Sequence, residues 1–132
     1  MKRLKFLPLV FCFFVACKKH HEAVKPQLTG QWEWVSSFGG IAGITYTPQS
    51  TGQTWGLKLN ADLSFIQTGD FSGSDTGVYS VTQQPSGSST INYINLFFVH
   101  NGDEQYSYTF SSDTLVLGDG NADGLISKFV KR

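Results

Sequence analysis

The sequence contains little cysteine: two residues in 132, Cys12 and Cys17, both close to the N-terminus. A domain built from the rest of the chain therefore has no disulfide, no thiolate nucleophile and no cysteine-ligated zinc. Histidine is also scarce, with three residues, and only His100 lies beyond residue 21. These absences remove most metal and nucleophile chemistry from the classes of function to be considered.

A long hydrophobic run is absent as well. The longest apolar stretch, from Phe6 to Val15, is too short to cross about 30 Å of hydrocarbon as a helix. A short basic segment, Met1 to Lys5, precedes it, and this combination is typical of a signal peptide. We therefore predict that residues 1–16 are a signal peptide that is removed.

The chain has no excess of positive or negative charge, because ten basic residues balance ten acidic ones. Removal of residues 1–16 takes away three of the basic residues and leaves a mildly acidic chain. Such a charge gives no reason to expect a nucleic-acid partner. Residues 17–27 are polar and have no hydrophobic periodicity, so we predict a tether there.

Helical spacing is absent from residues 28–132, a length that suffices for one hydrophobic core. Eight short runs rich in Val, Ile, Thr and aromatic residues alternate with turn signals and predict strands. The runs are Thr29–Ser37, Gln53–Asn60, Leu63–Thr68, Gly77–Thr82, Ile91–His100, Glu104–Phe110, Thr114–Leu117 and Leu125–Lys131. Strands joined in this way predict an all-β fold, an antiparallel up-and-down barrel of roughly eight strands that leaves no free edge.

The segments between the runs are expected to be turns and surface loops. Asn101-Gly102 predicts a tight hairpin, because both residues tolerate a positive φ. Residues 83–90 are interpreted as a surface loop, and residues 38–52 form the longest connector. Residues 91–99 are apolar on both faces, which indicates a strand that is covered on its outer side or that lies where two sheets meet.

Two parts of the sequence resemble known families. The first is Phe14-Val15-Ala16-Cys17, which is similar to the lipobox of bacterial lipoproteins. In that family the cysteine is acylated and the chain is cut before it. Phe14 stands where leucine is usual, whereas the small Ala16 is kept. The resemblance implies a lipid anchor at Cys17 and a place in the bacterial envelope, with the outer membrane expected. An ordinary secretory signal or an N-terminal membrane anchor are the alternatives.

The second resemblance covers residues 28–132. Gly30-Gln31-Trp32 resembles the G-x-W start of lipocalin-like domains, in particular small barrel lipoproteins of gram-negative envelopes. Four more segments resemble that family in the same order, namely 57–65, 77–79, 113–117 and 122–132, although Leu63 replaces the usual turn glycine. The family implies that Trp32 closes the narrow end of the barrel beneath a cation, either Lys128 or Arg132. It also implies that residues 38–52 lie over the open end, as a mobile lid or pinned to the rim by Ile41, Ile44 and Tyr46.

The segment Gly118 to Leu125, "GDGNADGL", contains the D-x-N-x-D-G order of a calcium-binding loop, with Asp119, Asn121 and Asp123 as its oxygen ligands. The twelfth position of such a loop needs a bidentate glutamate, and Val130 stands there. We therefore predict the final turn of the barrel and keep weak calcium binding as the alternative.

Catalysis is not expected. His100 is predicted at a solvated turn, no G-x-S-x-G segment is present, and the aspartates fall at turns, where they suit turn chemistry. No cofactor is predicted. Two binding functions remain. The first is a carrier of a small hydrophobic or amphipathic molecule, lined by Trp34, Trp55, Phe97, Tyr106 and Tyr108. The second is a filled barrel that binds an envelope protein through its outer face along residues 91–99.

Overall fold

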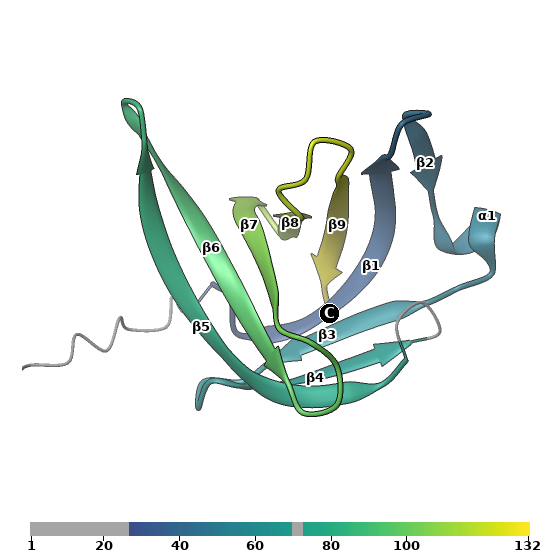
Figure 1. The fold of residues 1–132 in the computed structure, drawn as a ribbon. Coiled ribbons are helices and arrows are strands. Elements are labelled where there is room, and N and C mark those ends of the chain that lie inside the picture. Colours follow the sequence, from purple (N-terminus) through teal and green to yellow (C-terminus); the bar gives the residue numbers. More distant parts are fainter. Residues whose placement is uncertain (1–26, 70–72) are drawn as a thin grey trace, which may run out of the picture.

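The computed structural model describes residues 27–69 and 73–132, so the predicted signal peptide, Cys17 and most of the predicted tether lie outside the described residues. The described part of the chain is nearly all β-structure, with one short helix (Figure 1). Its elements are β1 (Gly30–Gly39), β2 (Ile44–Tyr46), α1 (Pro48–Thr51), β3 (Trp55–Leu59), β4 (Ser64–Gly69), β5 (Asp75–Ser86), β6 (Ser89–Phe98), β7 (Glu104–Ser111), β8 (Thr114–Gly118) and β9 (Leu125–Lys131).

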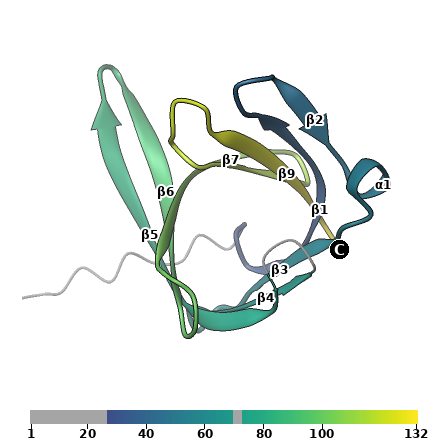
Figure 2. The same ribbon diagram turned by 45° about the vertical axis from the view of Figure 1, so that its right-hand side comes forward.

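Eight of these strands form a closed antiparallel barrel. They pair in the order β1-β3-β4-β5-β6-β7-β8-β9, and β9 then pairs with β1 from Trp32↔Lys131 to Gly39↔Leu125. Figure 2 shows the resulting ring of strands. β2 is an additional strand beside the last residues of β1. The prediction of an all-β, antiparallel, up-and-down barrel is therefore confirmed.

The interior of the barrel is occupied by apolar side chains that alternate along the strands. Every second residue of a strand points inward, so period-two sequences such as Trp32-x-Trp34 and Leu57-x-Leu59 supply the core. Thirteen apolar residues of the described chain are buried: Leu28, Trp32, Trp34, Leu57, Leu59, Phe65, Tyr79, Ile94, Leu96, Tyr108, Leu115, Leu117 and Phe129. They come from all eight barrel strands and the segment before β1, so the core extends around the whole ring.

Trp32 lies in the core at the end of the barrel where β1 begins. Its Nε1 donates a hydrogen bond to the carbonyl oxygen of Leu28 (2.8 Å), and Lys131 Nζ lies 5.3 Å from the centre of its ring. The expected cation, Lys128 or Arg132, is therefore wrong. Lys131 shares the inward parity of the buried Phe129, whereas Lys128 shares the outward parity of Ile126 and Arg132 follows β9.

Gly30, the first residue of the G-x-W segment, lies beside this lysine. Its φ is 139°, a conformation that residues with a Cβ rarely adopt. A Cβ at this position would lie 2.5 Å from Lys131 Cε. The absence of a side chain at residue 30 therefore leaves room for the aliphatic part of Lys131 to extend toward the Trp32 ring.

The expected long connector 38–52 contains regular structure. β2 pairs with β1 through Phe38↔Thr45 and its neighbours, and α1 forms one helical turn. Thr47 caps this helix, because its Oγ1 accepts a hydrogen bond from the backbone N–H of Ser50 (3.1 Å). Pro48 at the first helical position and Gly52 in the left-handed region complete a helix signal that hydrophobic periodicity does not reveal.

The expected loop at residues 83–90 is also wrong, because β5 continues to Ser86 and β6 begins at Ser89. Gly87, with a φ of 59°, and Ser88 form a two-residue turn, a Gly-Ser signal for a hairpin that the polar composition obscures. The β5–β6 hairpin tolerates Pro85 because this part of β5 is paired on one side only: β4 pairs with β5 only as far as Val78. The end of this hairpin projects beyond the ring in Figure 2.

Candidate functional site

Four of the five side chains expected to line the barrel mouth belong to the core or pack against it, and Phe97 does not. Trp34 and Tyr108 are buried members of the core, and Trp34 Nε1 donates to Ser37 Oγ (2.8 Å), which in turn bonds Ser127 Oγ (2.7 Å). Phe97 points to the outside, where 40% of it is exposed. Its place in the expected set is therefore wrong, because the inward parity of β6 belongs to the buried Ile94 and Leu96.

The other two residues of that set lie near the barrel rim. Trp55 is partly buried and packs edge to face on Phe129, with 4.7 Å between the ring centres. Tyr106 is partly buried, and its hydroxyl donates to Glu104 Oε2 (2.5 Å). Burial, helped by this bond to a carboxylate, raises the pKa of the Tyr106 hydroxyl, so it remains a neutral donor at physiological pH.

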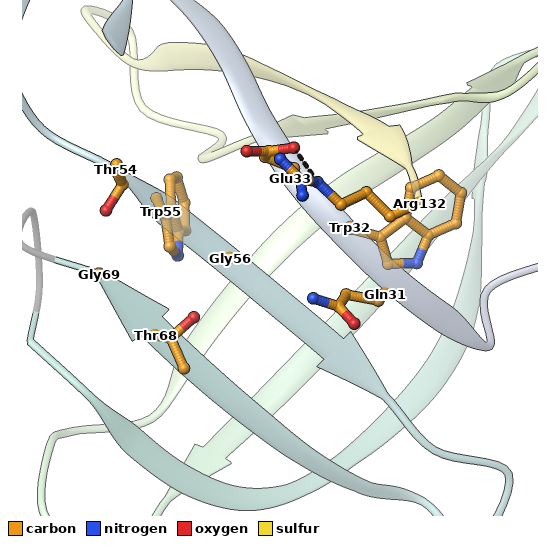
Figure 3. A pocket seen from close by; sticks show the side chains of 9 residues that line it. All are labelled: Gln31, Trp32, Glu33, Thr54, Trp55, Gly56, Thr68, Gly69 and Arg132. Carbon is orange, nitrogen blue, oxygen red and sulfur yellow. Dashed lines mark hydrogen bonds and ion pairs between the residues drawn. The ribbon is translucent and has the colours of Figure 1, made fainter.

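A hollow of about 270 Å³ opens on the outer wall over β1, β3 and β4 (Figure 3). It forms because Glu33, Gly56 and Thr68 are directly paired across the three strands and the middle residue has no side chain. The full lining is Gln31, Trp32, Glu33, Thr54, Trp55, Gly56, Thr68, Gly69 and Arg132. Of the expected ligand residues, Trp55 is the one that borders this space.

The chemistry of this Gly56 hollow is mainly polar. The Arg132 guanidinium donates to the Glu33 carboxylate along one side, and this bond is drawn as a dashed line in Figure 3. The hydroxyls of Thr54 and Thr68 lie on the opposite side. The hollow therefore offers both donors and acceptors beside two tryptophans, and a small polar or amphipathic molecule fits this character. An interior glycine in a strand is the signal that predicts such a close approach, and it was missed at Gly56.

Asp75 is a buried carboxylate that was expected at a turn. It is the first residue of β5, and its oxygens accept hydrogen bonds from the backbone N–H of Thr76, His100 and Asn101 and from the Asn101 amide. His100 Nδ1 lies 3.0 Å from Asp75 Oδ1. The bond with His100, joined by the backbone donors, lowers the pKa of Asp75 from 3.8 to about 2.

This carboxylate lies where β6 and β7 are joined, and their hairpin forms without the tight Asn101-Gly102 turn that was expected. Neither residue has a positive φ, and residues 99–103 instead wrap around Asp75 as the connection from β6 to β7. The hydrogen bonds link residues 25 and 26 positions apart, a contact that no local sequence pattern indicates. Asp75 therefore has a positioning role, and His100 is part of the same cluster rather than a free turn residue.

The segment 119–124 forms the last turn of the barrel, between β8 and β9. Asp119 Oδ1 accepts the backbone N–H of Asn121 (3.0 Å), and Oδ2 accepts that of Leu125 (3.0 Å). A Cβ on Gly124 would lie 1.8 Å from Asp119 Oδ1, so this glycine permits the carboxylate to enter the turn. The first of the three residues considered as calcium ligands thus has both oxygens bonded to backbone groups.

Apolar side chains gather on the outside of β4, β5 and β6. Val78 and Phe97 are directly paired, and Val99 N–H donates to the carbonyl oxygen of Thr76, the cross-strand partner of Ile66. Ile66, Val78, Phe97 and Val99 are each between 39% and 66% exposed. We call these four residues the β4–β6 apolar wall.

Searches of known protein families, curated proteins and solved structures return no match for this chain. No helix within residues 27–69 and 73–132 is long and apolar enough to cross a membrane. The candidate sites therefore rest on their own geometry, which offers the β4–β6 apolar wall and the Gly56 hollow.

Proposed function

We propose that the chain is a lipoprotein of the bacterial envelope, acylated at Cys17 and held at the outer membrane, whose barrel binds a protein partner. The leader and the lipobox-like segment in the sequence support the anchor, and the G-x-W segment followed by a barrel supports the lipocalin-like resemblance. The role is one of binding rather than catalysis. The observation that carries it is the β4–β6 apolar wall.

The β4–β6 apolar wall favours the binding of a protein partner, because its apolar side chains are contiguous and exposed. Isolated apolar residues are common on protein surfaces, but adjacent ones on a flat strand face are typical of interaction sites. Around them lie polar side chains that bond to one another, including Asn95 with Gln105 (2.6 Å) and with Ser80 (3.3 Å). An apolar centre with a polar surround is the usual anatomy of a protein interface.

Chemical crosslinking in envelopes tests this proposal. Val78→Glu places a charge at the centre of the wall, and we expect it to abolish a crosslinked band that the unchanged protein gives. Thr109→Glu is the matched control, because Thr109 is exposed on β7 away from the wall. Equal melting temperatures of the two variants exclude unfolding as the cause. A band that survives Val78→Glu contradicts the proposal.

Binding of a small amphipathic molecule is a second candidate function, and the Gly56 hollow favours it because Trp55 borders that space. Native mass spectrometry of the chain purified from envelopes reads both the acyl groups on Cys17 and any retained ligand. We expect a retained mass to disappear in Gly56→Val, whose side chain occupies the hollow, and to persist in Gly102→Val, where added atoms meet open space. An empty unchanged protein contradicts this candidate.

A further inference from the structure

The end of the β1–β2 hairpin is a second exposed apolar surface, separate from the β4–β6 apolar wall. Phe38 in β1 is directly paired with Thr45 in β2 and with Ile126 in β9. The turn between β1 and β2 runs from Gly40 to Gly43, whose N–H donates to the Gly40 carbonyl oxygen (3.0 Å). Figures 1 and 2 show this hairpin extending from the rim of the ring.

Four side chains give this hairpin end its character. Ile41, in the turn, is 92% exposed, and Phe38, Ile44 and Ile126 are each about half exposed. Phe38 and Ile126 lie together on the outer face, whereas Ile44 is paired with Gly39 and has the opposite parity. The end and both faces of the hairpin are therefore apolar. We call Phe38, Ile41, Ile44 and Ile126 the apolar tip.

Charge is absent from the segment that carries most of this surface. Between Glu33 and Lys58 the sequence has no Asp, Glu, Lys, Arg or His. Moving a charged side chain into a bilayer is costly, and this segment has none to move. The closest charge on the same face of β9 is Lys128, two residues from Ile126, and it is a cation that suits anionic headgroups.

The length of chain before the barrel permits contact with the membrane. Gln27 is ten residue steps from Cys17, and this length of chain spans at most about 35 Å when extended. β1 covers about 30 Å between Gly30 and the hairpin. A lipid on Cys17 can therefore lie in the same bilayer surface as the apolar tip, although the two are attached at opposite ends of β1.

The two exposed apolar surfaces lie on different sides of the ring. β1 and β9 are adjacent, and three strands separate β1 from β6 in each direction around the ring, in the order β1-β3-β4-β5-β6-β7-β8-β9. Figure 2 shows β5 and β6 across the ring from β1 and β2. A bilayer at the apolar tip therefore leaves the β4–β6 apolar wall accessible.

We propose that the apolar tip inserts into the boundary between headgroups and acyl chains of the bilayer that carries the lipid anchor. The inference rests on the proposed anchoring at Cys17 and adds a second point of attachment, which restricts the orientation of the barrel. A lipid surface fits better than a flat protein face, because apolar residues project from both faces and the end of one narrow hairpin. The inserted side chains leave water without burying any charge.

A fluorescent probe on the barrel itself tests this insertion independently of the native anchor. Residues 27–132 include every described core residue and contain no cysteine, so Ile41→Cys gives a single labelling site. An N-terminal hexahistidine tag holds this chain on vesicles of phosphatidylethanolamine and phosphatidylglycerol that contain a nickel-chelating lipid. We expect a polarity-sensitive dye at residue 41 to shift to shorter emission wavelength and to be quenched by acyl-chain quenchers.

Two controls make the result specific. The same dye on Ser88→Cys, at the turn of the β5–β6 hairpin, is expected to keep its aqueous emission. In the chain labelled at residue 41, Ile44→Asp is expected to reduce the inserted fraction relative to the free fraction by about tenfold or more, and Val99→Asp to leave it unchanged. Melting temperatures verify that both aspartate variants remain folded.

An aqueous emission at residue 41 on these vesicles overturns the proposal. If the dye responds only after envelope proteins are added, the apolar tip binds protein and the lipid proposal is wrong. Acylation of Cys17 is measured separately, by the mass of the full chain isolated from envelopes. Failure of the anchor and failure of the insertion are thus read in different experiments.

Discussion

At the scale of single residues, contacts across strands determine the roles of the charged side chains. Lys131 rather than Lys128 lies over Trp32, because the alternation of β9 gives residue 131 the parity of the buried Phe129. The sequence contains this signal, since Ser127, Phe129 and Lys131 are spaced by two. The inward or outward parity along residues 127–131 therefore predicts, from the sequence alone, that Lys131 rather than Lys128 contacts Trp32.

Lys131→Met is expected to lower the free energy of unfolding by about 0.5–1 kcal/mol, because it removes the cation from an exposed cation–π contact and keeps the length of the side chain. Lys128→Met is the matched control and is expected to change it by less than about 0.5 kcal/mol. Urea denaturation followed by tryptophan fluorescence measures both. Equal losses in the two variants contradict the assignment to Lys131.

The Asp75 carboxylate makes stability depend on pH in a defined direction. The fold lowers the pKa of Asp75 from 3.8 to about 2, so the ionised form stabilises the native state above pH 3.8. This contribution is lost as the pH falls through about 2. We expect Asp75→Asn to unfold more readily than the unchanged protein at pH 7, and the difference to shrink between pH 3.8 and 2.

Thermal unfolding at a series of pH values measures that difference. Asp103→Asn is the control, because Asp103 is exposed in the same connection between β6 and β7. A difference that stays constant down to pH 2 shows that the charge of Asp75 contributes nothing to the fold.

At the scale of elements, short polar segments were harder to interpret than strands. The Gln, Ser and Pro content of residues 83–90 predicted a loop, but residues 83–86 pair with residues 89–92 and extend β5. The helix α1 depends on a capping threonine, a proline and a glycine rather than on an apolar face, since none of its residues is buried. In both cases turn and cap residues carried the signal.

The turn between β8 and β9 gives a prediction that separates its two interpretations. Asp119→Ala removes the acceptor for the backbone N–H of Leu125, and we expect a loss of about 1 kcal/mol with or without calcium. Asp123→Ala is expected to have little effect, because Asp123 is exposed. Melting temperatures with calcium and with chelator measure this. A calcium-dependent rise that either substitution abolishes supports the calcium loop instead.

At the scale of the whole molecule, closure of the ring distributes stability unevenly. The pairing of β1 with β9 joins the two ends of the described barrel, from Trp32↔Lys131 to Gly39↔Leu125. The outer part of the β5–β6 ribbon has no such support, since β4 reaches only Val78 and β7 only Asn92. Local opening is cheaper where a strand pairs on one side alone.

Amide hydrogen exchange is expected to show this difference. We expect the backbone N–H groups of residues 83–91, other than Pro85, to exchange at least about tenfold faster than those of residues 32–38 in β1. Gly118 and its neighbours in β8 serve as an internal comparison, because that strand pairs on both sides. Similar protection of residues 83–91 and β1 contradicts the inference that ring closure concentrates the stability.

The sequence by itself determined the class of the fold, because alternation of apolar residues and the turns between strands are local properties. It also determined that Trp32, Trp34 and Tyr108 share the inward face, and that the outer face of residues 91–99 is apolar. Tertiary structure alone decided that Asp75 joins His100 and Asn101, and that Gly56 leaves a hollow between Glu33 and Thr68. It also gathered Phe38, Ile41, Ile44 and Ile126 at one hairpin end. Apart from Phe38, Ile41 and Ile44, which share one hairpin, these neighbours are far apart along the chain, and the register of the strands brings them together.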